Sequence, residues 1–204
     1  SSVVFGIPRL HNGKIDTPGS RLGFLLGIAT VPVVIVGLIL NMTGLDNAMR
    51  SVAVIGWAML LFGILLYWMD QKSPAEKSAS EWTLKDAVIL GLLQAVALIP
   101  GTSRSGITIT GARALGYMRQ DAAKLSMLMS IPTIIASAVL LGSEVIQSAD
   151  TAVARDGAIA AAFSFIAALL ALSLMMRLLR SVSYTPYVIY RIVLGLMLLY
   201  IAYS

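Results

Sequence analysis

The sequence predicts an all-α polytopic membrane protein with one integral membrane domain, and three observations support this. Of the 204 residues, 58% are hydrophobic and only 12% are charged, whereas a soluble domain carries about 25% charged residues. The mean hydropathy is +0.86. Several apolar runs are about 20 residues long, the length that a helix needs to cross a bilayer. A chain with so little charge cannot cover a water-facing surface of this size.

Five apolar runs are predicted to be transmembrane helices. They are residues 22–40, 52–69, 125–143, 157–176 and 186–204. Only the last run carries a charge, Arg191, near its start. Residues 1–20 form a polar leader without the apolar core of a signal peptide. Because the chain has no cysteine, it has neither disulfides nor a cysteine-based metal site.

Segment 84–116 differs, because Pro100-Gly101 splits it into two apolar pieces too short to span alone. It is either one broken spanning helix or a re-entrant helix-loop-helix, and basic residues decide between them. With a re-entrant hairpin, twelve basic residues lie on one side and two, Arg50 and Arg155, on the other. The twelve are Arg9, Lys14, Arg21, Lys72, Lys77, Lys85, Arg113, Arg119, Lys124, Arg177, Arg180 and Arg191. With a spanning segment the split is even, so the positive-inside rule predicts a hairpin that enters from the cytoplasm.

The tip of this hairpin has the composition of a receptor for phosphate oxygens. It combines Arg104 with hydroxyls at 102, 103, 105 and 108 and with two glycines, Gly101 and Gly106. An arginine at membrane depth is costly and marks a functional site by default. Its planar guanidinium group can donate two parallel hydrogen bonds to a pair of phosphate oxygens. The first turn of the next helix adds N–H groups that have no partner within the helix. We therefore predict a phosphate or pyrophosphate site inside the membrane. The excess of basic over acidic residues is explained by the membrane topology, and nothing in the sequence predicts nucleic-acid binding.

The tip sequence P-G-T-S-R-S-G-I-T, residues 100–108, resembles the P-G-x-S-R-S-x-x-T signature of the bacterial undecaprenyl-pyrophosphate phosphatases, the bacitracin-resistance family. Gln94 and segment 181–191 extend the similarity. The resemblance implies hydrolysis of undecaprenyl pyrophosphate to the monophosphate in the bacterial inner membrane, at a site open to the periplasm. It also implies an inverted-repeat bundle and a divalent cation, Mg or Ca.

By the same resemblance, Arg104 and Ser103 are the expected catalytic residues. Ser103 is either a covalent nucleophile or a hydrogen-bond donor. The expected substrate-binding residues are Gly101, Thr102, Ser105, Gly106 and Thr108. The expected partners are the polyprenyl pyrophosphate and membrane lipids.

The sequence departs from the family pattern in one respect. The family's acidic E/Q-x-x-x-E motif and its S-S-x-G-H segment are both absent, and the single histidine, His11, lies in the polar leader outside any such context. No metal ligands can therefore be assigned. We expect this chain alone to be an incomplete enzyme with a cleft beside Arg104, completed by an upstream segment or by a second copy in a homodimer. The alternatives to a phosphatase are a polyprenyl-phosphate flippase and a truncated, non-catalytic member.

Overall fold

A computed structural model describes residues 18–45, 49–148, 151–178 and 183–204. Residues 1–17 of the predicted leader, His11 among them, lie outside the described residues. The described part contains seven α-helices and one short 3-10 helix. They are α1 (Pro18–Thr43), α3 (Val52–Lys72), η1 (Ala79–Glu81), α4 (Leu84–Val96), α5 (Arg104–Ala114), α6 (Arg119–Ser148), α7 (Thr151–Leu178) and α8 (Thr185–Tyr203).

The all-helical prediction is confirmed, and so is the number of helices able to span. Five of the described helices, α1, α3, α6, α7 and α8, are long and apolar enough to cross a membrane. The helices α4 and α5 have 13 and 11 residues, which is too short to cross. Pro32 in α1 and Pro132 in α6 lie within continuous helices.

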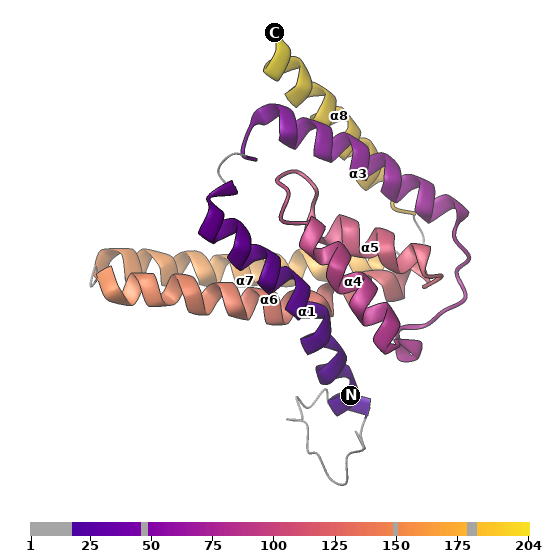
Figure 1. Ribbon diagram of the computed structural model, residues 1–204, viewed down its shortest axis with the longest axis horizontal. Helices are drawn as coiled ribbons and strands as arrows, with labels where there is room; N and C mark the ends of the chain where they lie inside the picture. Colours follow the sequence, from indigo (N-terminus) through magenta and orange to yellow (C-terminus); the bar gives the residue numbers. More distant parts are fainter. Residues whose placement is uncertain (1–17, 46–48, 149–150, 179–182) are drawn as a thin grey trace.

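Two helix pairs form most of the packing (Figure 1). The antiparallel helices α3 and α8 approach closely at Gly56 and Gly195, where an added Cβ would contact backbone about 3.1 Å away. The helix α1 packs against α4, and an added Cβ at Gly91 would lie 2.6 Å from the carbonyl oxygen of Ala29. The helices α6 and α7 extend together to one side, and residues 155–174 of α7 are exposed along their whole length. Small residues thus set the contacts of the pairs, as is common between membrane helices.

The helices α4 and α5 form a hairpin whose outer ends meet. The Tyr117 hydroxyl, just after α5, donates to the carboxylate of Asp86 in the first turn of α4, at 2.6 Å. Lys77 contacts the same carboxylate at 3.1 Å. Burial, together with the hydrogen bond to Asp86, raises the pKa of Tyr117, so this phenol stays a neutral donor. At its other end the hairpin loop lies against the first turn of α3, since a Cβ on Gly101 would be 2.5 Å from the carbonyl oxygen of Ile55.

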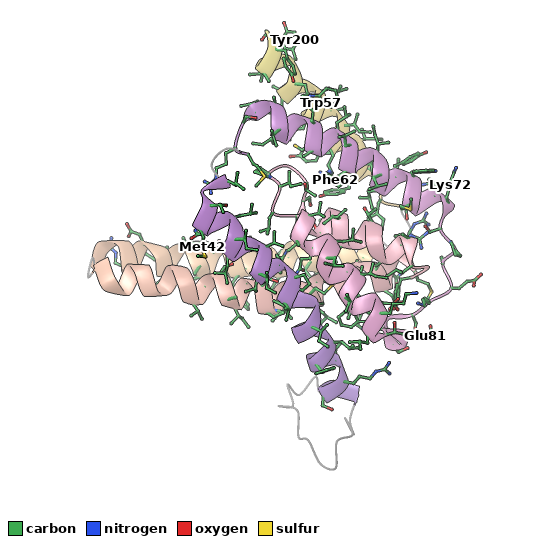
Figure 2. The ribbon with its side chains drawn as sticks, in the orientation of Figure 1. Met42, Trp57, Phe62, Lys72, Glu81 and Tyr200 are labelled. Carbon is green, nitrogen blue, oxygen red and sulfur yellow. The ribbon has the colours of Figure 1, made fainter. Side chains whose placement is uncertain are left out.

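The outer ends of the hairpin belong to what we call the basic end of the molecule. There Asp70, at the end of α3, is almost fully buried and pairs with Arg113 at 3.2 Å and Arg119 at 2.7 Å. Lys72 and Glu81 lie at this end, whereas Trp57 and Tyr200 lie at the opposite end of α3 and α8 (Figure 2). Among the described residues that the charge count places on this side, Arg191 has a buried side chain that reaches the hairpin loop instead. Its charge therefore lies at the loop end of the hairpin and does not belong in the count for the basic end.

Candidate functional site

The hairpin loop that joins α4 to α5 is held in a conformation that few residues adopt. Gly101 has φ +90° and Ser103 has φ 66°, and Ser103 is the only non-glycine residue with positive φ in the described part of the chain. Such a conformation costs about 1–3 kcal/mol for a residue with a side chain and persists where the surroundings enforce it. Here the Ser103 hydroxyl caps α5 by accepting from the Gly106 N–H at 3.2 Å. This cap fixes the position of the N-terminus of α5 relative to the loop.

Arg104 is the first residue of α5 and extends toward α6. Its Nη1 donates to the carbonyl oxygen of Ser130 at 3.3 Å, and the side chain is half-buried. Beside it lies an open pocket of about 430 Å³, lined also by Thr133, Ile134, Ser137 and Ala138 of α6. The expected cleft beside Arg104 is therefore present. A guanidinium has five N–H donors, so Arg104 keeps several for a ligand.

Most of the other predicted site residues surround the N-terminus of α5 without lining this pocket. The exposed Ser105 hydroxyl lies 3.4 Å from the Ser103 hydroxyl. Gly106 is buried, and so is Thr102. Thr108 is also buried, and its hydroxyl contacts the Arg104 carbonyl at 2.8 Å and the Ser126 hydroxyl at 2.7 Å. Thr108 therefore joins α5 to α6, and the structure does not bring it to the pocket.

Two residues of α8 that were not predicted as site residues contact the loop directly. Arg191, which is 3% exposed, donates from Nη2 to the carbonyl oxygens of Gly101 at 2.7 Å and Thr102 at 2.9 Å. The Tyr187 hydroxyl lies 2.9 Å from the Ser103 hydroxyl and accepts from Arg191 Nη1 at 3.4 Å. Arg191 thus fixes the loop backbone, and Tyr187 connects it to Ser103.

Three of the five buried side-chain atoms without a hydrogen-bond partner in the described residues lie around this loop. Buried polar groups nearly always have partners, so each exception calls for an explanation. Gln94 Oε1, Thr102 Oγ1 and Arg191 Nε have none within the described residues. Gln94 donates from Nε2 to Thr133, a lining residue of the Arg104 pocket, at 3.2 Å. The side chains around the loop therefore have more hydrogen-bond donors and acceptors than the fold itself pairs. This is expected of a site that binds a polar ligand.

Comparison with known proteins assigns the chain to a family. The family model described as "Bacitracin resistance protein BacA" matches residues 2–197. The chain belongs to this family. The undecaprenyl-diphosphatase of Ruegeria pomeroyi is 67% identical over 199 residues, which cover 98% of this chain and 74% of that protein. The undecaprenyl-diphosphatase of Dinoroseobacter shibae is 68% identical over 202 residues, with 99% and 76% covered. Undecaprenyl-diphosphatase 1 of Rhodospirillum rubrum is 40% identical over 203 residues, with 100% and 72% covered.

The divalent cation that membership of the bacitracin-resistance family implies does not fit the residues at this loop. Divalent metals such as Mg²⁺ and Ca²⁺ take carboxylate and carbonyl oxygens as ligands. The residues that the structure describes include no group of three or more His, Cys, Asp or Glu side chains that could hold a metal ion. The loop instead offers two arginines and several hydroxyls. We therefore assign no metal ligand and derive no step through a metal.

Proposed function

We propose that this protein is an undecaprenyl-diphosphatase, which hydrolyses undecaprenyl pyrophosphate to undecaprenyl phosphate and phosphate and so recycles the lipid carrier of cell-wall synthesis. The names of relatives up to 68% identical support the activity. One structural observation carries the choice of site: the Arg104 guanidinium is half-buried at the N-terminus of α5, beside an open pocket of about 430 Å³. A buried cation with free donors beside a cavity suits a substrate with two linked phosphates.

The proposed reaction is an in-line displacement at the terminal phosphorus of the pyrophosphate. Water attacks that phosphorus, the bond to the bridging oxygen breaks, and the lipid leaves as its monophosphate. Arg104 binds the non-bridging oxygens and stabilises the charge that develops on them. The first amide groups of α5, at Arg104 and Ser105, have no partner within the helix, and helix N-termini of this kind bind phosphate oxygens. The Ser103 hydroxyl, which contacts Tyr187 of α8, and the exposed Ser105 hydroxyl donate further hydrogen bonds to the phosphate oxygens.

The pocket also provides for the hydrocarbon part of the substrate. Thr133 and Ser137 add hydroxyls near Arg104, whereas Ile134 and Ala138 give the same pocket an apolar side. Ile134 is 55% exposed, so this side opens laterally from α6. A polyprenyl chain can leave the pocket along these residues into the bilayer while its pyrophosphate stays at Arg104.

The proposal includes the placement of the site in the inner membrane. The hairpin enters from the cytoplasm and ends near the periplasmic surface, within an inverted-repeat bundle. The contact of Asp86 with Tyr117 supports entry and exit at the basic end. The contact of Gly101 with Ile55, in the first turn of α3, supports a loop that lies near the opposite face. Cysteines introduced at Ser80 and Thr43 should react with an impermeant thiol reagent from opposite sides; labelling of both from one side would contradict the placement.

Phosphate release tests the function directly. Together with the upstream segment expected from the sequence, the purified protein should release phosphate from undecaprenyl pyrophosphate, whereas the 204-residue chain alone should not. In the active form, Arg104→Gln should abolish both release and substrate binding. The matched control Arg155→Gln, at an exposed position in α7, should retain both. Transport of undecaprenyl phosphate across liposomes without phosphate release would favour a flippase. Substrate binding without either activity would favour a non-catalytic member.

A further inference from the structure

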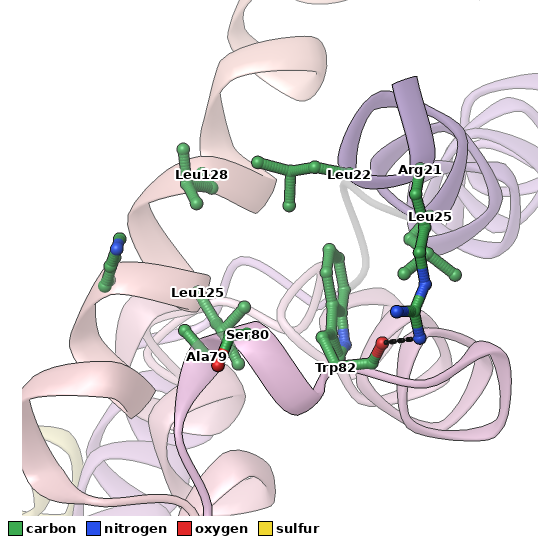
Figure 3. A pocket seen from close by; sticks show the side chains of 9 residues that line it. Arg21, Leu22, Leu25, Ala79, Ser80, Trp82, Leu125 and Leu128 are labelled. Carbon is green, nitrogen blue, oxygen red and sulfur yellow. Dashed lines mark hydrogen bonds between the residues drawn. The ribbon is translucent and has the colours of Figure 1, made fainter. Parts of the chain in front are cut away.

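A second pocket lies at the basic end and shares no residue with the Arg104 pocket. It has a volume of about 250 Å³ and is formed where the N-terminal parts of α1 and α6 meet η1 (Figure 3). Its apolar walls are Leu22 and Leu25 of α1 and Leu125 and Leu128 of α6. Nothing in the hydrolysis of a pyrophosphate near the opposite end requires this pocket.

Two cations line the pocket, and in the described part of the chain neither has a carboxylate beside it. Arg21 and Lys124 are both exposed, and no described acidic residue lies within ion-pair distance of either. Arg21 gives one hydrogen bond to the Trp82 carbonyl oxygen at 3.0 Å, drawn in Figure 3, and keeps its other donors. Glu81, the acidic residue of η1, instead accepts from the Ser78 N–H at 2.7 Å. The pocket therefore carries a net positive charge.

Trp82 adds a further polar group to an otherwise apolar wall. Its side chain is 2% exposed and its indole N–H is buried with no acceptor among the described residues. A buried tryptophan N–H usually has a hydrogen-bond partner. The pocket thus combines two cations with the side chain of Trp82 and four leucines. This combination suits an anion that is joined to an apolar group, and it suits a small inorganic ion less well.

We propose that this pocket binds the headgroup of an anionic phospholipid from the leaflet at the basic end. Basic pockets between membrane helices are suited to anionic lipid headgroups. The volume corresponds to about eight water molecules in the liquid, enough for a phosphate and its glycerol. The acyl chains then lie on the outer face of α1, where Phe24 and Val31 are exposed. The site is separate from the proposed hydrolysis, so its test does not depend on turnover.

The proposal is tested by lipid binding to the full chain in phosphatidylcholine nanodiscs that contain a minor fraction of phosphatidylglycerol. We expect one phosphatidylglycerol to be retained in native mass spectrometry after detergent extraction, and phosphatidylcholine not to be retained. The double variant Arg21→Gln/Lys124→Gln should bind phosphatidylglycerol roughly 30-fold more weakly, because each cation near an anionic lipid contributes about a five- to sixfold factor. The matched control Lys72→Gln/Lys85→Gln removes two exposed charges at the same end without touching the pocket, and should bind normally.

A second variant separates the pocket from surface charge in general. Ala79→Phe places a ring at the pocket wall while Arg21 and Lys124 remain, and it should also prevent retention of the lipid. Equal weakening in the Lys72/Lys85 control would overturn the proposal in favour of a diffuse electrostatic effect. Displacement of the lipid by inorganic phosphate at equal concentration would overturn it in favour of a simple anion site. Equal retention of phosphatidylcholine would overturn it as well.

Discussion

The two ends of the α4–α5 hairpin both bury arginines, but they neutralise them differently. At the basic end, Arg113 and Arg119 share the carboxylate of Asp70, with Arg113 and Asp70 almost completely buried. At the loop end, Arg191 is equally buried, yet its partners are the carbonyl oxygens of Gly101 and Thr102. Among the described residues, Arg104 donates only to the carbonyl oxygen of Ser130. A carbonyl oxygen orients a guanidinium but does not cancel its charge.

This difference separates a structural cluster from a binding site. Buried charges are costly unless they are paired. At the basic end the buried Arg113 has a counter-charge within the protein, the carboxylate of Asp70, so this pair stabilises the fold. At the loop end two cations remain without a described carboxylate at hydrogen-bond distance. A pyrophosphate supplies the missing negative charge on binding, which is why the loop end, and not the larger basic cluster, suits the substrate.

The largest expected effect comes from removing the shared carboxylate. Asp70→Asn leaves Arg113 buried without a counter-charge, and breaking a buried pair in this way costs about 3–5 kcal/mol. We expect a strongly lowered midpoint of thermal unfolding in detergent. Asp156→Asn is the control, because the Arg155–Asp156 pair is exposed and such pairs contribute little. An Asp70→Asn protein that unfolds normally but fails to release phosphate would place the basic cluster in the active site and break the comparison.

The second effect tests whether the loop end binds by geometry or by charge alone. Arg104→Lys keeps the charge but loses the planar fork. Hydrogen bonds to charged groups contribute about 1.5–3 kcal/mol each, so we expect phosphate release to fall by roughly 10- to 100-fold. The unfolding midpoint should change little, because Arg104 is only half-buried. Near-normal release by Arg104→Lys, with Arg155→Lys as the exposed control, would show that a point charge is sufficient.

The third effect concerns the backbone that holds the loop. Gly101→Ala would force a Cβ to within 2.5 Å of the Ile55 carbonyl oxygen, at a φ of +90° that alanine rarely adopts. The loop must shift, so we expect activity to fall severalfold, together with a loss of stability. Gly27→Ala should be neutral, because no heavy atom lies within 4 Å of its added Cβ. Full activity in Gly101→Ala would mean that the loop conformation is not required for catalysis.

The sequence predicted the parts of this molecule that are local along the chain. Helices that span a membrane need long apolar runs, and the loop residues from Pro100 to Thr108 are contiguous, so both could be recognised directly. Contacts from distant segments could not be. Arg191 is 90 residues from Gly101 in sequence, and its charge in an apolar run was the one available signal. Thr108 shares the motif but is turned into the α5–α6 contact by the helical period, which the motif alone does not reveal.

The smallest expected effect tests the connection between α8 and the loop. The Tyr187 hydroxyl joins Arg191, at 3.4 Å, to the Ser103 hydroxyl, at 2.9 Å, so it transmits the position of a fixed cation to a predicted catalytic residue. Tyr187→Phe removes this hydroxyl and keeps the ring that lies beside Arg191. One neutral hydrogen bond contributes about 0.5–1.5 kcal/mol, so we expect a threefold to tenfold fall in phosphate release, roughly, with binding of the substrate retained.

Tyr190→Phe is the matched control for this variant, since Tyr190 is 60% exposed on the same helix. If Tyr187 acts only by orienting Ser103, then Ser103→Ala should abolish the difference between Tyr and Phe at position 187. Independent, additive losses in the double variant would show that the tyrosine contacts the substrate itself. In that case the loop end would hold its ligand from α8 as well as from α5, and the contrast with the Asp70 cluster would extend to a third helix.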